Sequence, residues 1–220
     1  RPLFRARLKL PPGRDVLLQN ETGSIGREAL KVMKKNYGYE APVRDQEVTL
    51  RRLRSAEEPV FQQAMELYRQ SFPIHEQRER ESQRRIMDEE EYRFELVYRG
   101  GKWAGILLCW ETERFIYVEH FAVASEARNA GIGAAALSSS PGGGGTVILE
   151  IDPPQDEISV RRRGFYERAG FAPCAFEHVH PPYHEHTPGH RLVVMSQPEA
   201  LTEWEYEEFK EYLENKVMAQ

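Results

Sequence analysis

A strand that runs through a glycine turn into a helix is the sequence feature that most constrains how this chain folds. Residues 115–123 are mostly apolar, and Arg128, Gly131 and Gly133 follow as Arg-x-x-Gly-x-Gly before the helix-forming run 134–137. Glycines at these positions let the backbone approach a bulky anion without Cβ clashes. Successive N–H groups of such a turn point to one spot at the positive end of a helix dipole. The segment therefore predicts a pyrophosphate-sized anion site.

The rest of the chain alternates between strand-like and helix-like patterns. Short apolar or alternating runs predict strands at residues 48–53, 94–98, 103–110, 115–123, 147–151 and 191–195. Helical spacing predicts helices at residues 59–71, 159–169 and 202–218, with a capping box at the start of the last one. The dense charge of residues 76–90 predicts an exposed helix, and the prolines of residues 177–189 predict a loop. This order indicates a mixed α/β fold.

Composition and charge narrow the class of protein. The 220 residues are 40% hydrophobic and 30% charged, and no run approaches the ~20 apolar residues of a membrane helix. Two cysteines make neither a disulfide framework nor a zinc site. The start of the chain has no apolar stretch typical of a secretory signal, so we expect a cytoplasmic protein without a membrane partner.

The charge is unevenly distributed, which predicts two regions. Residues 1–45 hold ten Lys/Arg and five Asp/Glu, whereas the rest of the chain holds 20 basic and 30 acidic residues. We expect residues 1–45 to be a basic N-terminal extension of unknown role and residues 46–220 to be the main domain. An acidic body favours cationic or amine ligands over nucleic acid.

A second motif, taken together with the glycine turn, carries a family resemblance. The predicted strand that contains Leu149 is followed by a helix that ends in Tyr166-x-x-x-Gly170-Phe171. Both motifs, in this order, resemble those of the GNAT superfamily of acetyl-CoA-dependent N-acetyltransferases, over residues 48–195 and on to about 218. The resemblance implies a mixed, mostly antiparallel central sheet flanked by helices, with the fourth and fifth strands splayed apart.

The resemblance also implies where acetyl-CoA binds. The backbone of one strand end pairs with the pantetheine arm, and the turn holds the pyrophosphate. The implied cofactor-binding residues are Phe121, Ala122, Val123, Arg128, Asn129, Ala130, Gly131, Ile132, Gly133 and Ser159. Ser159 stands where many members carry Asn, so its contact with CoA is in doubt. Tyr166 stands where many members place a tyrosine near the CoA sulfur.

Transfer of an acetyl group to an amine needs a base, because neutralising an amine of pKa ~10.4 at pH 7 costs roughly 4–5 kcal/mol. Glu119 is the first candidate, with His120 and Glu150 as alternatives. Strand alternation places Glu119 and Phe121 on one face of the sheet, and His120 and Ala122 on the other. Tyr166 is the candidate general acid for the departing thiolate, and a strand N–H near Phe121 is the candidate oxyanion donor.

The acceptor side is less sharply specified. His75, Glu76 and Arg78 lie between two predicted helices in a region that often covers the acceptor site of the family, and Tyr183 is a candidate aromatic wall. Five histidines crowd one segment and raise the question of a metal, namely His178, His180, His184, His186 and His190. No cysteine accompanies them and prolines interrupt them, so we expect no metal site.

These observations together predict an N-acetyltransferase that transfers acetyl from acetyl-CoA to a primary amine by direct attack in a ternary complex. The expected acceptor is a small-molecule or peptide amine, no nucleic-acid partner is expected, and a homodimer is left open. The alternative is a GNAT-fold module that binds CoA or regulates without turnover.

Overall fold

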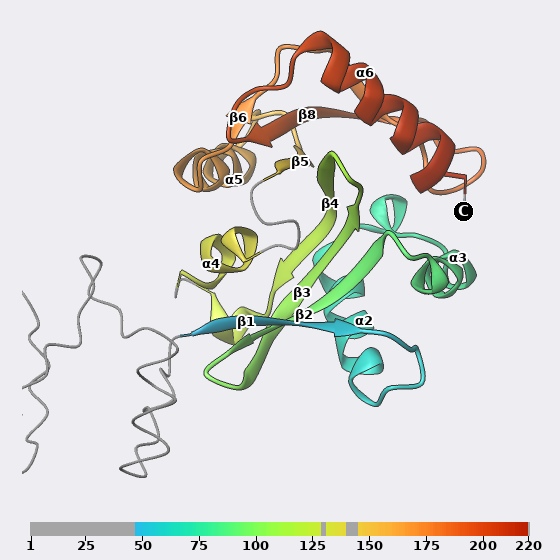
Figure 1. The fold of residues 1–220 in the computed structure, drawn as a ribbon, viewed down its shortest axis with the longest axis vertical. Coiled ribbons are helices and arrows are strands. Elements are labelled where there is room, and N and C mark those ends of the chain that lie inside the picture. Colours follow the sequence, from blue (N-terminus) through green and yellow to red (C-terminus); the bar gives the residue numbers. More distant parts are fainter. Residues whose placement is uncertain (1–46, 129–130, 140–144, 220) are drawn as a thin grey trace, which may run out of the picture. The chain divides into compact units, whose positions relative to one another are not determined.

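The computed structural model describes residues 47–128, 131–139 and 145–219. Residues 45–220 belong to one compact unit, whose helices and strands are drawn in Figure 1. The predicted N-terminal extension and the turn residues Asn129 and Ala130 lie outside the described residues. The boundary between the extension and the main domain stays a prediction.

The described part of the chain is built on one eight-stranded sheet in the order β1-β2-β3-β4-β5-β8-β6, with β7 paired to β8. The strands are β1 Val48–Leu53, β2 Tyr92–Arg99, β3 Lys102–Glu111, β4 Phe115–Val123, β5 Thr146–Ile151, β6 Ala172–Pro173, β7 His178–His180 and β8 His190–Gln197. All neighbours run antiparallel except β4 and β5, which are parallel. The expected mixed, mostly antiparallel sheet is confirmed.

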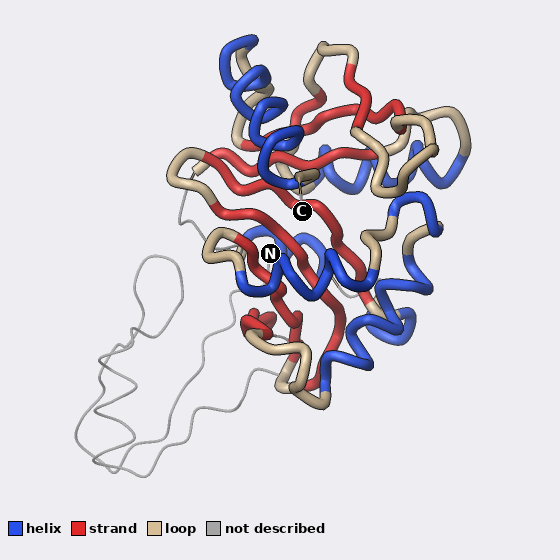
Figure 2. Tube along the Cα trace, turned by 90° about the vertical axis from the view of Figure 1, so that its right-hand side faces the viewer, coloured by secondary structure: helices blue, strands red, loops and turns tan. Residues whose placement is uncertain are grey.

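Helices cover both faces of this sheet (Figures 1 and 2). They are α2 Val60–Ser71, α3 Arg80–Arg85, α4 Ile132–Ser138, α5 Glu157–Arg168 and α6 Glu203–Tyr212, with short turns at Ile74–Glu76, Ile86–Asp88 and Ser125–Ala127 and a π-helical end at Leu213–Val217. The buried faces of α2 and α6 pack in one core cluster, and those of α4 and α5 in another. In the described ranges, no helix is long and apolar enough to cross a membrane.

The parallel pair β4–β5 opens partway along its length. Pairing begins at Phe115–Thr146 and ends at Val118–Leu149, although β4 continues to Val123. β5 meanwhile pairs with β8 as far as its last residue, Ile151. The end of β4 therefore has backbone groups with no strand partner on the β5 side, as the resemblance implied.

A β-bulge lies at the point of opening. Leu108 of β3 pairs with His120 of β4, while its neighbour Cys109 pairs with Val118, so Glu119 is an extra residue in β4. As a result, Glu119 and His120 both contact side chains of the cluster formed by α2 and α6, whereas Phe121 packs in the other cluster. The predicted alternation, with Glu119 and Phe121 on one face, is wrong because a bulge breaks the period of two.

Two other expectations are also wrong. The charged segment 76–90 is not one exposed helix, because it contains only the short α3 and buries Arg78, Gln83 and Ile86. The His/Pro-rich segment is not a loop throughout, since β7 pairs with β8 and buries His178 and His180. In both segments, tertiary contacts override the local composition.

Candidate active site

A cavity of about 680 Å³ lies where β4 and β5 separate. Most of the residues predicted for the two substrates line it, namely His75, Glu76, Glu119, His120, Phe121, Ala122, Val123, Arg128, Glu150, Tyr166 and Tyr183. They come from the Ile74–Glu76 turn, β4, β5, α5 and the segment between β7 and β8. The fold thus brings the predicted donor and acceptor residues together in one space.

The predicted donor wall of the cavity is the free end of β4. Phe121, Ala122 and Val123 line the cavity beyond the last residue pair with β5. Arg128 is exposed and donates from Nε to the carbonyl oxygen of Val123 at 3.1 Å, so it also holds the end of the strand. An extended backbone with unpaired groups can accept another extended chain by hydrogen bonding, as an added strand does.

The glycine turn is required for two different reasons. Gly131, the residue before α4, has a φ of +72°, a backbone conformation that residues with a side chain rarely adopt. A Cβ at Gly133 would come within 2.9 Å of the Phe165 ring, so this glycine allows α4 to pack closely on α5. Ile132 is buried in the core between them. Gly131, Ile132 and Gly133 do not line the cavity, and their predicted contact with the pyrophosphate stays a prediction.

Ser159 lies away from the cavity. It is buried in the first turn of α5, where its hydroxyl accepts from the N–H groups of Gln155 and Asp156, both at 3.1 Å. The Asp156 carboxylate accepts in return from the N–H of Ser159, which completes a capping box. Ser159 thus caps α5 and does not line the cavity, and its predicted contact with CoA stays a prediction.

Tyr166 lines the cavity from the later part of α5. Its ring packs edge-on against Phe165 and Phe171. Burial raises the pKa of Tyr166 to about 12. The phenol therefore keeps its proton near neutral pH and is available as a donor.

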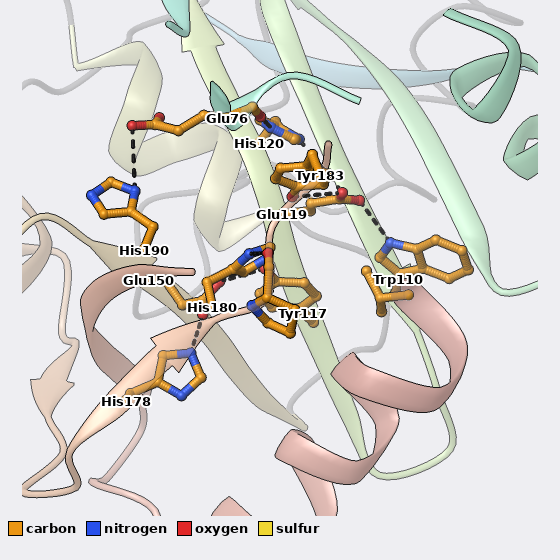
Figure 3. Close-up of polar contacts among 12 residues, drawn as sticks. Glu76, Trp110, Tyr117, Glu119, His120, Glu150, His178, His180, Tyr183 and His190 are labelled. Atoms are coloured by element: carbon orange, nitrogen blue, oxygen red, sulfur yellow. Dashed lines mark hydrogen bonds and ion pairs between the residues drawn. The ribbon is translucent and has the colours of Figure 1, made fainter. Parts of the chain in front are cut away.

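Glu119 is held by three donors. Its side chain is 0% exposed, and it accepts from Arg78 Nε at 2.7 Å, Trp110 Nε1 at 2.8 Å and Tyr183 Oη at 2.9 Å. Figure 3 shows Trp110 and Tyr183 pointing at the carboxylate. Arg78 donates further to the carbonyl oxygen of Val217, so the C-terminal helical turn helps to fix the pair.

The charges of this pair stabilise each other. Burial opposes ionisation of Glu119, but Arg78, His120 and the two neutral donors outweigh it, so the pKa of Glu119 is lowered. Burial likewise opposes the charge of Arg78, but the carboxylate outweighs it and the pKa of Arg78 is raised. Glu119 is therefore an anion whose oxygens are already occupied.

His120 packs edge-on between Tyr68 and Phe72, and its Nε2 lies 2.8 Å from the carbonyl oxygen of Glu76. A carbonyl oxygen can only accept, so Nε2 carries the proton and Nδ1 carries the lone pair. Nδ1 is buried and has no hydrogen-bond partner among the described residues. Burial lowers the pKa of His120, which keeps the ring neutral.

Glu150 belongs to a second buried network on β5. Its carboxylate accepts from Tyr117 Oη at 2.5 Å and contacts His178 Nε2, and His180 Nε2 lies 3.9 Å away. Burial opposes ionisation, but His180, His178 and Tyr117 outweigh it and lower the pKa of Glu150. Figure 3 shows the side chains of this network around the carboxylate.

His180 differs from His178 in having a nitrogen free for a ligand. Its Nδ1 lies 2.6 Å from the carbonyl oxygen of Pro181, so Nδ1 carries the proton and Nε2 the lone pair. His180 lines the cavity, whereas both ring nitrogens of His178 have partners, Glu150 and Tyr206.

The sequence drew attention to His180 only as one of a cluster, and it missed Tyr117 altogether. The signal for Tyr117 was its place two residues before Glu119 on the same strand.

The acceptor wall carries a third group of titratable side chains. Glu76, on the turn after α2, lies near His75 and His190, and His190 lies near Asp152. Burial is the main cause that raises the pKa of Glu76, and the negative charge of Asp152 raises it further. His75, Glu76, Asp152 and His190 all line the cavity.

Comparisons with known proteins agree with this geometry. The family model of the acetyltransferase (GNAT) family matches residues 59–171. A solved structure from Bacteroides thetaiotaomicron, assigned to the GNAT acetyltransferases, is 26% identical, with a TM-score of 0.72 over 78% of this chain and 99% of that chain.

A second solved structure, Arabidopsis thaliana Naa50 with a bisubstrate analogue, is 17% identical, with a TM-score of 0.50 over 69% of this chain and 99% of that one. At that identity the likeness is one of fold alone. No curated protein sequence gives a match. The matched family covers just over half of the chain, including β4, the glycine turn and Tyr166, and the chain therefore belongs to the GNAT family of acetyltransferases.

Proposed function

We propose that this enzyme transfers an acetyl group from acetyl-CoA to a primary amine by direct attack in a ternary complex. One observation carries the proposal. The free end of β4 and Tyr166 line the same cavity as Glu150, His180 and the acceptor-wall residues. A thioester placed along β4 is therefore open to an amine in the same space, with no need for a covalent acyl-enzyme.

The donor binds along β4 in this proposal. The amides of the pantetheine arm pair with the backbone of Phe121–Val123 where β5 has turned away. The N–H groups of the first turn of α4, which an α-helix leaves unpaired, face the pyrophosphate together with Arg128. A strand N–H at the bulge hydrogen bonds the oxyanion that forms at the thioester carbonyl.

His180 and Glu150 form the proton-accepting unit. His180 Nε2 has a lone pair in the cavity, and the Glu150 carboxylate 3.9 Å away stabilises the imidazolium that forms when the amine loses a proton. Glu150 is itself the candidate base if the amine reaches it directly. His120 stays a weaker candidate because its lone-pair nitrogen is buried from the cavity.

Glu119 is a positioning residue in this proposal. Three donors occupy its carboxylate, and transfer of a proton to it would leave the buried Arg78 charge without a counterion. Through these bonds Glu119 orients Tyr183, which lines the acceptor side of the cavity. Tyr166 donates a proton to the departing CoA thiolate, since burial keeps its hydroxyl protonated.

The cavity supports a cationic acceptor, either a small molecule or a peptide amine. Glu76, Asp152 and Glu150 all line it, and carboxylates attract a protonated amine before it is neutralised. The acceptor wall thus complements the positive charge that a primary amine carries near neutral pH.

Thiol release from acetyl-CoA in the presence of an amine panel tests the proposal. We expect amine-dependent release by the wild-type chain and a loss of kcat of ~10²–10⁴-fold in His180→Ala, the range typical of a general base. His186→Asn is the matched control, because His186 is exposed on the same segment and lies outside the cavity.

The alternative, a module that binds CoA without turnover, predicts a stabilising thermal shift with CoA and no thiol release with any amine. An unchanged kcat in His180→Ala and in Glu150→Gln would contradict the assignment of the proton-accepting unit.

A further inference from the structure

Two histidines and a carboxylate converge at the acceptor wall from segments that are far apart in the sequence. Glu76 Oε1 lies 3.5 Å from His75 Nε2 and 3.7 Å from His190 Nδ1, and one ligand atom from each of the three residues lies within 4.8 Å of the others. Figure 3 shows the His190 ring directed at the Glu76 carboxylate. The rings of His75 and His190 are inclined at 66°, so they meet edge to face without stacking.

These separations fit a metal ion better than they fit hydrogen bonds. Zinc binds histidine nitrogen and carboxylate oxygen at ~2.0–2.2 Å in a tetrahedron, which places neighbouring ligand atoms ~3.3–3.5 Å apart. The contacts at 3.5 and 3.7 Å are longer than a good N–H···O bond but close to that edge length. The two histidine ligand atoms lie within 4.8 Å of each other, so binding of one ion would draw the two rings closer together.

The surroundings of His190 also favour a metal ion at this position. Its Nδ1 is buried and has no hydrogen-bond partner among the described residues, which is unusual for a polar atom in a native fold. Its other nitrogen, Nε2, lies 3.5 Å from Asp152 Oδ1. At this distance Asp152 makes no good hydrogen bond, but its negative charge favours the tautomer with the proton on Nε2, which leaves the lone pair on Nδ1.

We propose that His75, Glu76 and His190 bind a divalent transition-metal ion, with Zn²⁺ preferred, and that Asp152 supports His190 from behind. A tetrahedral ion with three protein ligands has one coordination position left. Because all three ligands line the cavity, water or a group of the acceptor can occupy that position. From the sequence we expected no metal site, because His190 was considered only with the other histidines of its own segment, whereas His75 and Glu76 come from the turn after α2.

The ion would join the turn after α2 to β8 across the acceptor wall. Glu76 has two connections there, since its carboxylate is a ligand and its carbonyl oxygen bonds His120. A bound ion would fix this wall and offset the charge of Glu76, so that Asp152 and Glu150 would be left to attract a cationic acceptor. The inference concerns the same cavity as the proposed function, but it is tested by metal binding alone.

Calorimetric titration of the chelator-treated full chain with ZnCl₂, with the metal counted by elemental analysis, tests the site. We expect one Zn²⁺ per chain, with affinity lowered at least tenfold in Glu76→Gln and His190→Ala and about tenfold in Asp152→Asn. Co²⁺ in place of Zn²⁺ should give the visible absorption of a tetrahedral ion.

Two further variants distinguish loss of the metal site from loss of the fold. His75→Ala removes a ligand whose side chain is half exposed, so it should fold normally and still lose affinity at least tenfold. His186→Asn changes an exposed histidine of the same His-rich segment and should bind as the wild type does.

Absence of zinc binding, or equal affinity in wild type, His75→Ala and His190→Ala, would overturn the proposal. Acetyl transfer measured separately would be untouched by that result. Conversely, zinc binding without thiol release would contradict the proposed function and support the metal site.

Discussion

Two buried carboxylates, Glu119 on β4 and Glu150 on β5, face partners of different chemistry. Glu119 is paired with the guanidinium of Arg78, which does not lose its proton in proteins. Glu150 is paired with the imidazoles of His178 and His180, whose ring nitrogens, unlike a guanidinium, can carry either a proton or a lone pair. The first pair is therefore a fixed pair of charges, and the second can exchange a proton with a substrate.

Glu119→Gln should lower the free energy of unfolding at pH 7 by about 3–5 kcal/mol, because it leaves the buried Arg78 charge uncompensated. The folded-state pKa of Glu119 is lowered, so the carboxylate stabilises the fold above its unfolded pKa of about 4.3. This contribution is lost as the pH falls through the folded-state pKa. Denaturant unfolding from pH 7 down to pH 3 should thus show the deficit shrinking below about pH 4.3.

Glu113→Gln is the control for this series, because Glu113 is exposed in the turn between β3 and β4. It should unfold like the wild type at every pH. A deficit in Glu119→Gln that stays constant down to pH 3 would contradict the assignment of a charged, Arg-paired Glu119.

Tyr166→Phe should lower kcat by ~10²-fold and leave the KM for acetyl-CoA nearly unchanged, because it removes a proton donor and keeps the packed ring. The pKa of about 12 keeps the wild-type phenol protonated through the assay range, so loss of its proton should give no alkaline limb below about pH 11. Steady-state kinetics from pH 6 to pH 10 measures both. An unchanged kcat would remove Tyr166 from the mechanism.

Among the helices and strands, the sequence correctly predicted those features that depend on residues close together in the chain. The strand at β4 and the capping box at Thr202 were both expected and are both present. Each depends on neighbours within a few residues, which the sequence displays directly. The bulge at Glu119 could not be seen, because an extra residue in one strand is defined by pairing with another.

The motif correctly singled out Gly133, and the structure shows a further reason why this residue is a glycine. The sequence marked it as part of an anion-binding turn, and the structure shows that its missing Cβ makes room for Phe165. The motif identified the residue, but only the packing of α4 on α5 reveals this constraint.

Gly133→Ala should destabilise the fold by about 1–3 kcal/mol, because the added Cβ would meet the Phe165 ring at 2.9 Å. Gly164→Ala is the matched control within α5, where the nearest atom is the mobile end of Arg168 at 3.2 Å. It should stabilise the helix by about 0.5–1 kcal/mol. Thermal unfolding of the two variants should give shifts of opposite sign, and shifts of the same sign would contradict this packing argument.

At the scale of the whole molecule, the cavity depends on contacts between distant parts of the chain. Arg78 follows α2, pairs with Glu119 on β4 and donates to Val217 near the C-terminal end. The sequence suggested that Arg78 would touch substrate, but its charged neighbours predicted an exposed helix. Its burial arises from these long-range partners, which no local pattern records. The family motifs named the β4 residues that line the cavity, but they singled out neither Asp152 nor His190 as lining residues.

The central claim is that one cavity holds acetyl-CoA and an amine together for direct attack. Initial rates of CoA release, measured while acetyl-CoA and amine concentrations are both varied, test it most directly. The account predicts intersecting lines in double-reciprocal plots and no burst of CoA when amine is omitted. Parallel lines with an amine-independent burst of CoA would contradict it, because they would require an acyl-enzyme.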